Sequence, residues 1–353
     1  MRASLFLIPL LALSACLFDR WKQSTGDCPP GATDCVVPPS CDPGDPSCTV
    51  LDGGTDANPN TDADPTVACA PTCTTSGCWE PMCSQMLRGE NLTAVWASPT
   101  NTVWFTTKSG RIFYLKPGNG TAATTNAQIF EASVAFSPRP TELNAIAGTS
   151  DVDLWAGGEM GKLLHRGTNA DWNGPVPSVI STIVDISARN ASEYWAVGLV
   201  GRLLHYNGAI WDLQSGFAET LNGVWVASNG DVFFCGEGGK VGIYQPGNGT
   251  QNVVAPTAKN LNDIHGTDRA NVWIVGGDAT SGAVAMNYNG SALAIKFQDT
   301  NPGFRGVYTD GSIVIAVGYK GRIVRVSGAT PTAEQNPSVN NLNAVSGNTP
   351  TGI

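Results

Sequence analysis

Histidine is scarce in this sequence, and the residue sets that most hydrolases and metal enzymes need are missing. The 353 residues include three histidines, no Gly-x-Ser-x-Gly nucleophile elbow and no cluster of metal-ligand residues. These absences argue against acyl transfer and metal catalysis, and no metal or cofactor is expected. No basic patch with interleaved aromatic residues occurs either, which argues against a nucleic-acid partner.

The first fifteen residues have the pattern of an export signal. Arg2 gives a positive start, and the apolar stretch Leu5–Leu13 is too short to span a bilayer as a mature helix. The run Leu13-Ser-Ala-Cys16 resembles the lipobox of bacterial lipoproteins. That resemblance implies cleavage before Cys16, acylation of its thiol and new amine, and, with Leu17 next, placement in the outer membrane rather than the inner one. An ordinary secretory signal followed by a chance cysteine is the alternative, and both place the protein in or beyond the cell envelope.

Residues 16–78 are expected to be a lipid-anchored, disordered linker. Pro, Gly, Asp, Thr and Cys dominate, and no hydrophobic period occurs, so the segment cannot bury enough apolar surface to offset its chain entropy. Acidic and amide residues alternate from Asp56 to Asp64, like the early ligands of an EF-hand loop. However, Thr61 and Val67 stand where that loop needs glycine and glutamate, so a solvated acidic linker is the better interpretation.

Eight cysteines in this stalk are expected to form disulfides, because an even number in an exported segment is typical of a disulfide framework. They are Cys28, Cys35, Cys41, Cys48, Cys69, Cys73, Cys78 and Cys83. The sequence cannot choose their pairing. A thiolate metal site on the last four is the alternative, although their spacings are slightly wide for a zinc knuckle. Cys235 stands apart in the repeats, aligned with valines, and is expected to be a small buried hydrophobe.

Beyond the stalk the chain repeats one pattern seven times, with the seventh copy cut short. Each copy begins with a short apolar run, and the starts lie 38 to 51 residues apart. The starts are Leu92, Leu143, Ile183, Leu221, Leu261, Phe304 and Leu342. A period near forty built from short strands predicts an all-β chain, a β-propeller of six complete four-stranded repeats plus a partial seventh.

One repeat can be divided into four strands. In residues 183–217 the second strand contains Trp195, a Gly198–Gly201 turn precedes the third strand, and Asn207-Gly208 is typical of a hairpin before an outer strand that starts at Trp211. The second-strand position holds an aromatic residue in five of the six copies, which indicates packing between blades rather than a ligand site.

These features resemble bacterial propellers related to the photosystem II assembly-factor and BNR-type families. The resemblance covers about residues 92–347 and implies the propeller fold. The Asp box of BNR sialidases (Ser-x-Asp-x-Gly-x-Thr-Trp) is missing from every copy, as is an arginine cluster with a Tyr/Glu pair. The resemblance therefore supports the fold and weakens the case for glycosidase activity.

The propeller domain is expected to cover residues 79–353. Gly77-Cys-Trp79 looks like the turn and tryptophan of an outer strand, so residues 79–87 could share a blade with the innermost strand at Leu342. Such a blade would join the two ends of the domain. Too few residues follow 347 for two further strands, so three alternatives remain: a seventh blade is incomplete, six blades close with the ends on top of one another, or the chain is cut short inside its last repeat.

The candidate binding residues lie in the turns between second and third strands, on the face where propellers often bind partners. Five basic residues follow these turns and could form a positive ring for an acidic partner or an anionic glycan. They are Arg111, Lys162, Arg202, Lys240 and Arg322. Other candidates in the turns are Glu159, Glu237, Asp278, Tyr319 and Lys320. A solvated charge ladder paired with neighbouring acids is the alternative.

Two functions remain open at this point, and binding is favoured over catalysis. The first is a lipid-anchored binding or assembly module for an envelope or extracellular protein or glycan. The second is a glycan-active hydrolase with a site at the channel mouth, for which Asp185 and Asp263 are the candidate carboxylate pair. No other residues support a catalytic role for that pair, so no catalytic residue is assigned.

We expect Cys16 to carry lipid, so Cys16→Ser should move the protein from the membrane to the soluble fraction, because stable anchoring takes two or more acyl chains. Fractionation and intact-mass analysis check this. A serine variant that stays in membranes, together with a wild type that lacks acyl groups, would contradict the lipobox interpretation.

Overall fold

The computed structural model describes residues 87, 89–116, 128–132, 142–169, 171–174, 181–327, 330–334 and 339–347. The chain divides into two units. The first comprises Met1–Leu17 and Cys69–Ile353, and the second comprises Phe18–Ala68. All the described residues belong to the first unit. The expected signal peptide, Cys16, the linker and the eight stalk cysteines lie outside the described residues. In the part that is described, no helix has the length and apolar character needed to cross a membrane.

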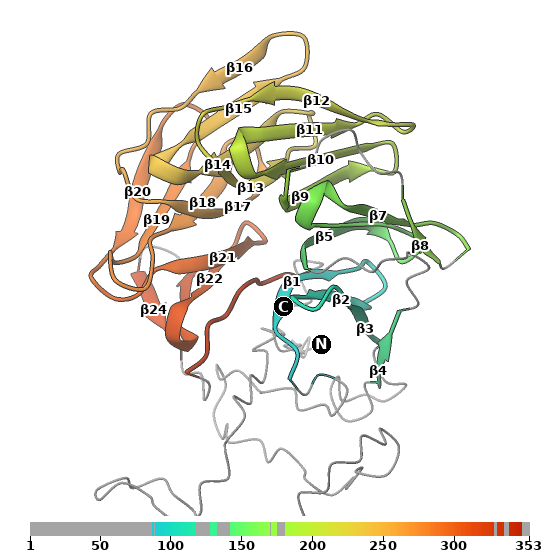
Figure 1. Ribbon diagram of the computed structural model, residues 1–353. Coiled ribbons are helices and arrows are strands. Elements are labelled where there is room, and N and C mark those ends of the chain that lie inside the picture. Colours follow the sequence, from blue (N-terminus) through green and yellow to red (C-terminus); the bar gives the residue numbers. More distant parts are fainter. Residues whose placement is uncertain are drawn as a thin grey trace, which may run out of the picture. The chain divides into compact units, whose positions relative to one another are not determined.

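The described residues form six four-stranded antiparallel sheets, the blades of a β-propeller (Figure 1). Blade 1 holds β1 (Leu92–Ala97), β2 (Val103–Thr107), β3 (Ile112–Lys116) and β4 (Gln128–Glu131). Blade 2 holds β5 (Leu143–Ser150), β6 (Asp153–Gly158), β7 (Leu163–Arg166) and β8 (Trp172–Asn173). Blade 3 holds β9 (Ile183–Asn190), β10 (Glu193–Gly198), β11 (Arg202–Tyr206) and β12 (Trp211–Gly216).

The remaining three blades have the same strand order, and short 3₁₀ turns join second to third strands in four of the six blades. Blade 4 holds β13 (Leu221–Val226), β14 (Val232–Gly236), β15 (Val241–Gln245) and β16 (Gly249–Asn252). Blade 5 holds β17 (Leu261–Asp268), β18 (Asn271–Gly276), β19 (Val284–Tyr288) and β20 (Leu293–Gln298). Blade 6 holds β21 (Phe304–Thr309), β22 (Ile313–Gly318), β23 (Ile323–Ser327) and β24 (Thr330–Ala333). The 3₁₀ turns are η2 (Glu159–Gly161), η3 (Leu199–Gly201), η4 (Glu237–Gly239) and η5 (Tyr319–Gly321).

The sequence repeats coincide with the blades, which confirms the predicted all-β propeller of six four-stranded repeats. The first six repeat starts are the first residues of the innermost strands. The seventh repeat, residues 342–347, lies between blade 6 and blade 1. Leu342 N donates to Gly318 O in blade 6 at 2.9 Å, and Ala97 N in blade 1 donates to Ser346 Oγ at 3.1 Å. This segment therefore occupies the place of a seventh innermost strand, and we refer to it as the seventh inner segment.

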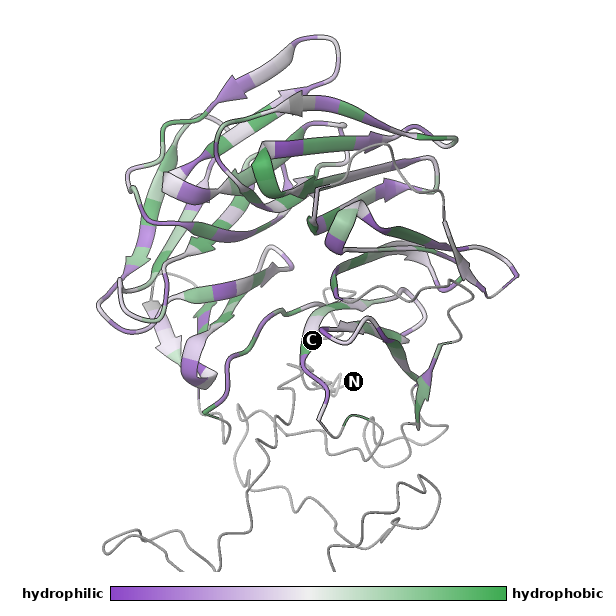
Figure 2. Cartoon of the chain, viewed as in Figure 1, coloured by the Kyte–Doolittle hydropathy of each residue, from purple (hydrophilic) through white to green (hydrophobic). Residues whose placement is uncertain are grey.

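The core lies between successive blades. Trp155 of blade 2 packs against Ile183, Tyr194, Leu204 and Trp211, which come from the four strands of blade 3. The aromatic column of the second strands recurs in the same role around the ring, and its members are buried. Apolar residues recur along the inner strands, whereas the exposed outer strand β16 is hydrophilic (Figure 2). The predicted packing role of the aromatic column is therefore confirmed.

Cys235 also takes the expected role. It is a free thiol in β14, fully buried among aliphatic side chains of blades 4 and 5. Burial raises the pKa of the Cys235 thiol, and the nearby carboxylates of Asp263 and Asp185 raise it further. A neutral, buried thiol is a poor nucleophile, so Cys235 acts as a packing residue.

Side-chain hydrogen bonds link the inner strands to one another. Five of them run from the second residue of an inner segment to the first carbonyl of the next: Thr93 to Leu143, Asn144 to Ile183, Asn222 to Leu261, Asn262 to Phe304 and Asn343 to Leu92. Five others run from a backbone N–H to a side chain of the preceding segment: Val224 to Asp185, Val307 to Asp263, Val226 to Ser187, Thr309 to His265 and Ala97 to Ser346. We call these bonds the inter-blade links.

Truncating one member of the aromatic column should strongly destabilise the propeller. Trp195 is buried against blade 4, so Trp195→Ala should lower the free energy of unfolding by about 3–5 kcal/mol. Urea unfolding followed by tryptophan fluorescence and circular dichroism measures this. Ile210→Ala, at a side chain that is 55% exposed, is the control and should change stability by less than about 0.5 kcal/mol. Equal effects of the two variants would contradict the inter-blade packing role.

Candidate functional site

The turns between second and third strands gather at one end of the blades, together with the segments that enter each first strand. Backbone hydrogen bonds place them there: Lys108 N to Asn91 O at 2.8 Å, Glu159 N to Glu142 O at 3.1 Å, Leu199 N to Thr182 O at 3.1 Å, Glu237 N to Thr220 O at 3.0 Å and Tyr319 N to Gly303 O at 3.1 Å. We call this end the turn face. It comprises residues 108–110, 159–161, 199–201, 237–239, 277–282 and 319–321.

The Gly-x-x-Gly pattern of the turns follows from close backbone contacts. A Cβ on Gly198 would lie 2.1 Å from Thr182 O, and a Cβ on Gly201 would lie 2.1 Å from Phe217 O. Gly201 also has φ +64°, in the left-handed region that favours glycine. Both ends of the turn therefore require glycine, and only the two central positions are free to vary.

The second of these central positions is also left-handed, yet three turns carry a side chain there. Met160, Val200 and Lys320 have φ of 56°, 58° and 55°, whereas the blade 4 turn places Gly238 at this position. The left-handed conformation costs an L-residue about 1–2 kcal/mol, and it is most unusual for a β-branched residue such as Val200. The chain thus carries strain at the tips of the turns, and this observation favours a functional role for the tips.

The strained tips of blades 2 and 3 are apolar and exposed. Met160 and Val200 are each 65% exposed, and Leu199 beside them is 42% exposed. η2 packs against β9, and Leu199 N donates to Thr182 O just before β9, so both turns flank the start of the same strand. We call Met160, Leu199 and Val200 the apolar tip.

The predicted basic ring lies next to the turns, but ion pairs within the blades neutralise three of its members. Arg111 Nη1 lies 2.6 Å from Glu90 Oε1, and Arg111 Nη2 lies 2.5 Å from Glu131 Oε2. Hydrogen bonding to Glu131 raises the pKa of Arg111, so this residue stays charged. Lys240 Nζ lies 3.8 Å from Glu219 and above the Phe217 ring.

Arg322 is the most enclosed of these pairs. Its guanidinium forms hydrogen bonds with both carboxylate oxygens of Asp299 and with Pro302 O, and it covers the rings of Phe297 and Phe304. Lys162 and Arg202 are partly buried, and among the described residues Arg202 Nε is buried without a hydrogen-bond partner. The basic ring as a binding site stays a prediction, and the ion pairs limit the charge that it can present.

The remaining candidates fall into two groups. Glu237 and Lys320 are exposed, and Glu159 and Tyr319 are partly exposed, with the Tyr319 hydroxyl accepting a hydrogen bond from Arg305 Nη1 at 3.0 Å. Asp278 instead organises its own turn. Its Oδ1 accepts from the N–H groups of Thr280 and Ser281 at 2.7 and 2.6 Å, and these bonds lower the pKa of Asp278.

Asp185 and Asp263, the candidate carboxylate pair for hydrolysis, serve as inter-blade links. Asp185 accepts from Ile186 N and Val224 N, both at 2.8 Å. Asp263 accepts from its neighbour Ile264 N at 2.8 Å and from the next blade at 2.7 Å. Each carboxylate thus binds two backbone N–H groups and joins two inner strands, which accounts for its presence without a catalytic role.

The surroundings of these carboxylates also change their ionisation. Both residues retain some accessible surface, but the atoms packed around the carboxyl groups remove most of their hydration. Desolvation raises the pKa of Asp185 to about 7. Desolvation, and then the charge of Asp185, raise the pKa of Asp263 well above its usual range.

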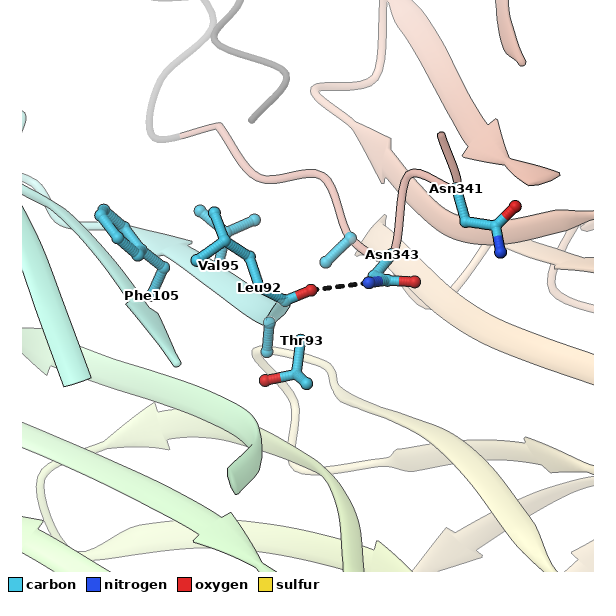
Figure 3. A pocket seen from close by; sticks show the side chains of 8 residues that line it. Leu92, Thr93, Val95, Phe105, Asn341 and Asn343 are labelled. Atoms are coloured by element: carbon cyan, nitrogen blue, oxygen red, sulfur yellow. Dashed lines mark hydrogen bonds between the residues drawn. The ribbon is translucent and has the colours of Figure 1, made fainter. Parts of the chain in front are cut away.

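A small cleft lies where the ring closes (Figure 3). It is lined by residues 92–95 of β1, Phe105 of β2, Asn341, Asn343 and Ala344. Asn343 Nδ2 points across it to donate to Leu92 O at 2.6 Å. Asn341 points away from β1 (Figure 3). The Asn341 side chain accepts from Lys320 N at 3.1 Å, which ties the segment to the turn of blade 6.

Comparison with known proteins identifies the fold. No family model matches the sequence, and no curated protein matches it. The described fold is similar to U3-55K, with a TM-score of 0.59 at 11% identity over 77% of this chain and 88% of that one. It is also similar to YCF48 bound to D1 peptide, with a TM-score of 0.52 at 12% identity over 69% of this chain and 80% of that one.

A third similar structure is the extracellular domain of the putative hybrid two component system BT4673 from B. thetaiotaomicron. Its TM-score is 0.55 at 15% identity, and the match covers 71% of this chain but 34% of that one. At these identities the likeness establishes the class of the protein, a β-propeller.

The raised pKa of Asp185 predicts a pH dependence of stability. The folded state favours the protonated carboxyl, so its contribution is full below the unfolded pKa near 3.9 and is lost as the pH rises through about 7. The free energy of unfolding should therefore fall between pH 4 and pH 8, and less so in Asp185→Asn, which cannot ionise.

Urea unfolding at pH 4, 5.5, 7 and 8 tests this. Asn222→Ala is the matched control, since it removes an inter-blade link but no titratable group, and it should keep the wild-type slope. A slope that is the same in Asp185→Asn as in the wild type would contradict the assignment.

Proposed function

We propose that this protein is an extracytoplasmic, lipid-anchored binding module that engages a protein partner through its turn face. The observation that carries the proposal is the apolar tip, whose exposed side chains include two in a strained backbone conformation. Folding alone gains nothing from an exposed Met160 or Val200, because glycine would relieve the strain at either position. Strain kept at an exposed apolar surface fits a site that buries these side chains against a partner.

The wider evidence supports the same class of function. The export signal and the lipobox-like run at Cys16 favour a location in the cell envelope. Among the similar propellers, YCF48 is described as bound to a peptide and BT4673 as an extracellular domain. The aliphatic character of the apolar tip favours a protein over a glycan, since Met, Leu and Val side chains offer no hydrogen bonds to sugar hydroxyls.

Charge at the turn face would act mainly on the rate of association. Lys320 is an exposed cation on this face, and Lys108, with a side chain 61% exposed, has only a long contact of 4.0 Å with Glu142, whereas closer pairs largely neutralise Arg111 and Arg322. A partner drawn in by the exposed cations would bind faster at low salt, because the Debye length shortens as ionic strength rises.

Val200→Gly separates the functional role of the tip from its structural role. Glycine removes the exposed side chain and the left-handed strain, so stability should stay the same or rise by up to about 1 kcal/mol. Retention of a partner from detergent-solubilised envelope proteins should fall several-fold, and further in the double variant Met160→Gly/Val200→Gly. Quantitative mass spectrometry of material retained on the immobilised full chain measures this.

Val152→Ala is the matched control for the capture experiment. Val152 is 46% exposed on the β5–β6 hairpin, at the end of blade 2 opposite the turn face, and its loss should leave capture unchanged. If the double variant retains the same proteins at the wild-type level, the apolar tip is not the interface. A captured glycan in place of a protein would favour the glycan alternative.

A further inference from the structure

Arg305 departs from the pattern of the inner ring. It is the second residue of β21, a position from which the side chains of five other inner segments donate to the first carbonyl of the next segment. The guanidinium of Arg305 is not used in this way. It lies over the ring of Tyr319, with Cζ 5.0 Å from the ring centroid, and its Nη1 donates to the Tyr319 hydroxyl at 3.0 Å. The described residues give this guanidinium no other hydrogen-bond partner, so Arg305 does not serve as an inter-blade link.

The charge of Arg305 has no counter-charge in the described part of the chain. Arg322 in the same blade binds both carboxylate oxygens of Asp299. Arg305 is also partly buried, yet no acid pairs with it among the described residues, and its Nε is buried without a hydrogen bond. Desolvation of a cation is costly when no opposite charge or hydrogen bond compensates it. A carboxylate that reaches this guanidinium would therefore offset a cost that the folded chain has already incurred.

Lys320 adds a second cation next to Tyr319. It is the exposed tip of η5, it has φ 55° in the left-handed region, and its backbone N–H donates to Asn341 Oδ1 at 3.1 Å. Its ammonium group has no acidic partner among the described residues. Blade 4 has Gly238 at this position, so the turn itself does not require lysine. Blade 6 therefore keeps backbone strain at a tip that presents positive charge, which favours a functional role for that charge.

The acids on the neighbouring segments do not neutralise these two cations. Asp278 lies beside the start of blade 6, where its carbonyl accepts from Gly303 N at 2.7 Å, but its carboxylate accepts from N–H groups of its own turn. Asp299, on the segment that leads into β21, is bound to Arg322. The charges of the blade 6 turn and of the second position of β21 are thus free to act on a ligand.

We propose that Arg305, Tyr319 and Lys320 form a carboxylate-binding site on the turn face, the blade 6 site, and that it receives Asp or Glu side chains of the protein partner. A guanidinium held against an aromatic ring presents paired N–H donors that match the two oxygens of a carboxylate. The Tyr319 hydroxyl accepts from Arg305 and keeps its own proton to donate, and Lys320 supplies a flexible point charge. The inference rests on the proposed function for one element, that the partner is a protein.

The blade 6 site would fix the orientation of the partner on the turn face. Blades 4 and 5 separate blade 6 from blades 2 and 3 on one side of the ring, and blade 1 and the seventh inner segment separate them on the other (Figure 1). The apolar tip and the blade 6 site thus lie in different sectors of one face. A partner that covers both must present an apolar patch and, apart from it, an acidic one.

The probe is a rhodamine-labelled peptide, Gly-Glu-Asp-Glu-Asp-Gly with an amidated C-terminus, titrated with the full chain at low ionic strength. Fluorescence anisotropy should show saturable binding, weakened at least fivefold by Arg305→Gln and by Lys320→Gly. Glycine relieves the strain at 320, so the second variant should fold at least as stably as the wild type and keeps the test decisive if the first is destabilised. Lys296→Gln is the matched control, because it removes one exposed positive charge on the outer strand β20, and it should bind like the wild type.

Arginine labelling gives a second readout that needs no variant. Phenylglyoxal reacts with guanidinium groups, and Arg322, which Asp299 encloses, is the internal control. Mapping by mass spectrometry should find Arg305 modified at least fivefold faster than Arg322. The acidic peptide should slow the labelling of Arg305 at least threefold, whereas its neutral counterpart Gly-Gln-Asn-Gln-Asn-Gly should leave the rate unchanged.

Capture of envelope proteins on the immobilised full chain separates this inference from the turn-face proposal. Arg305→Gln/Lys320→Gly should retain several-fold less of the proteins that the wild type retains, with the largest loss at low salt. Retention that depends on Met160 and Val200 but not on Arg305 and Lys320 would leave the turn-face proposal standing and overturn the blade 6 site. Peptide binding that Arg305→Gln abolishes, together with capture that ignores the apolar tip, would support the blade 6 site and overturn the role of the tip.

Three further outcomes would overturn the blade 6 site. The first is equal binding of the acidic peptide by the wild type and by both site variants. The second is displacement of the peptide by an equal concentration of inorganic phosphate, which would indicate a general anion site. The third is tighter binding of a heparin-derived oligosaccharide of equal charge that the same variants abolish, which would assign the site to an anionic glycan.

Discussion

The inter-blade links are the constraint on which the rest of this propeller depends. The inner strands of successive blades run side by side without a backbone ladder, so the N–H and C=O groups on their inner edges need other partners. Short polar side chains supply them, with Asn222 donating to one carbonyl and Asp185 and Ser187 accepting from two N–H groups. Because each bond crosses between blades, it also fixes the register of one sheet against the next. The apolar clusters between blades can then form only in that register.

The same constraint explains which parts of the chain are free to acquire function. Strand positions such as Asp263 and Cys235 are committed to links and cores, and the first and last glycines of the four Gly-x-x-Gly turns are committed by close backbone contacts. In those four turns only the two central residues vary without altering the fold. Met160 and Val200 occupy such positions in spite of the strain, whereas Gly238 in blade 4 takes the relaxed form. Turn tips are thus the places where this scaffold presents exposed side chains at a small cost in stability.

Much of the fold follows from the sequence because the repeat signal is local. The spacing of the apolar runs predicts the six blades, and the column that contains Trp195 predicts the core between them. Pairing of the basic residues with acids was one of the two interpretations of the sequence, but the particular partners could not be predicted. Asp299, the partner of Arg322, and Glu90, a partner of Arg111, lie in irregular segments that no period describes. The left-handed backbone conformation of Val200 could not be predicted either. The repeat pattern identifies the glycines that flank the turn, but it does not give the conformation of the residues between them. The second position of the inner segments is polar in six of the seven repeats, as at Asn343, with Val184 as the exception. The role of these polar residues as links depends on the distance between blades, which the sequence does not contain.

Where the ring closes, inter-blade links join blades 6 and 1 although the described residues form no complete sheet between them. Asn343 donates to Leu92 O and Ser346 accepts from Ala97 N, the same two bonds that join complete blades elsewhere. Leu342 and Val345 meanwhile continue the packing of blade 6. Among the described residues, it is therefore 342–347 that join the inner ring on both sides of the seventh position. Asn343, Ser346 and Leu342 thus hold blades 1 and 6 in register although, among the described residues, no complete sheet lies between them.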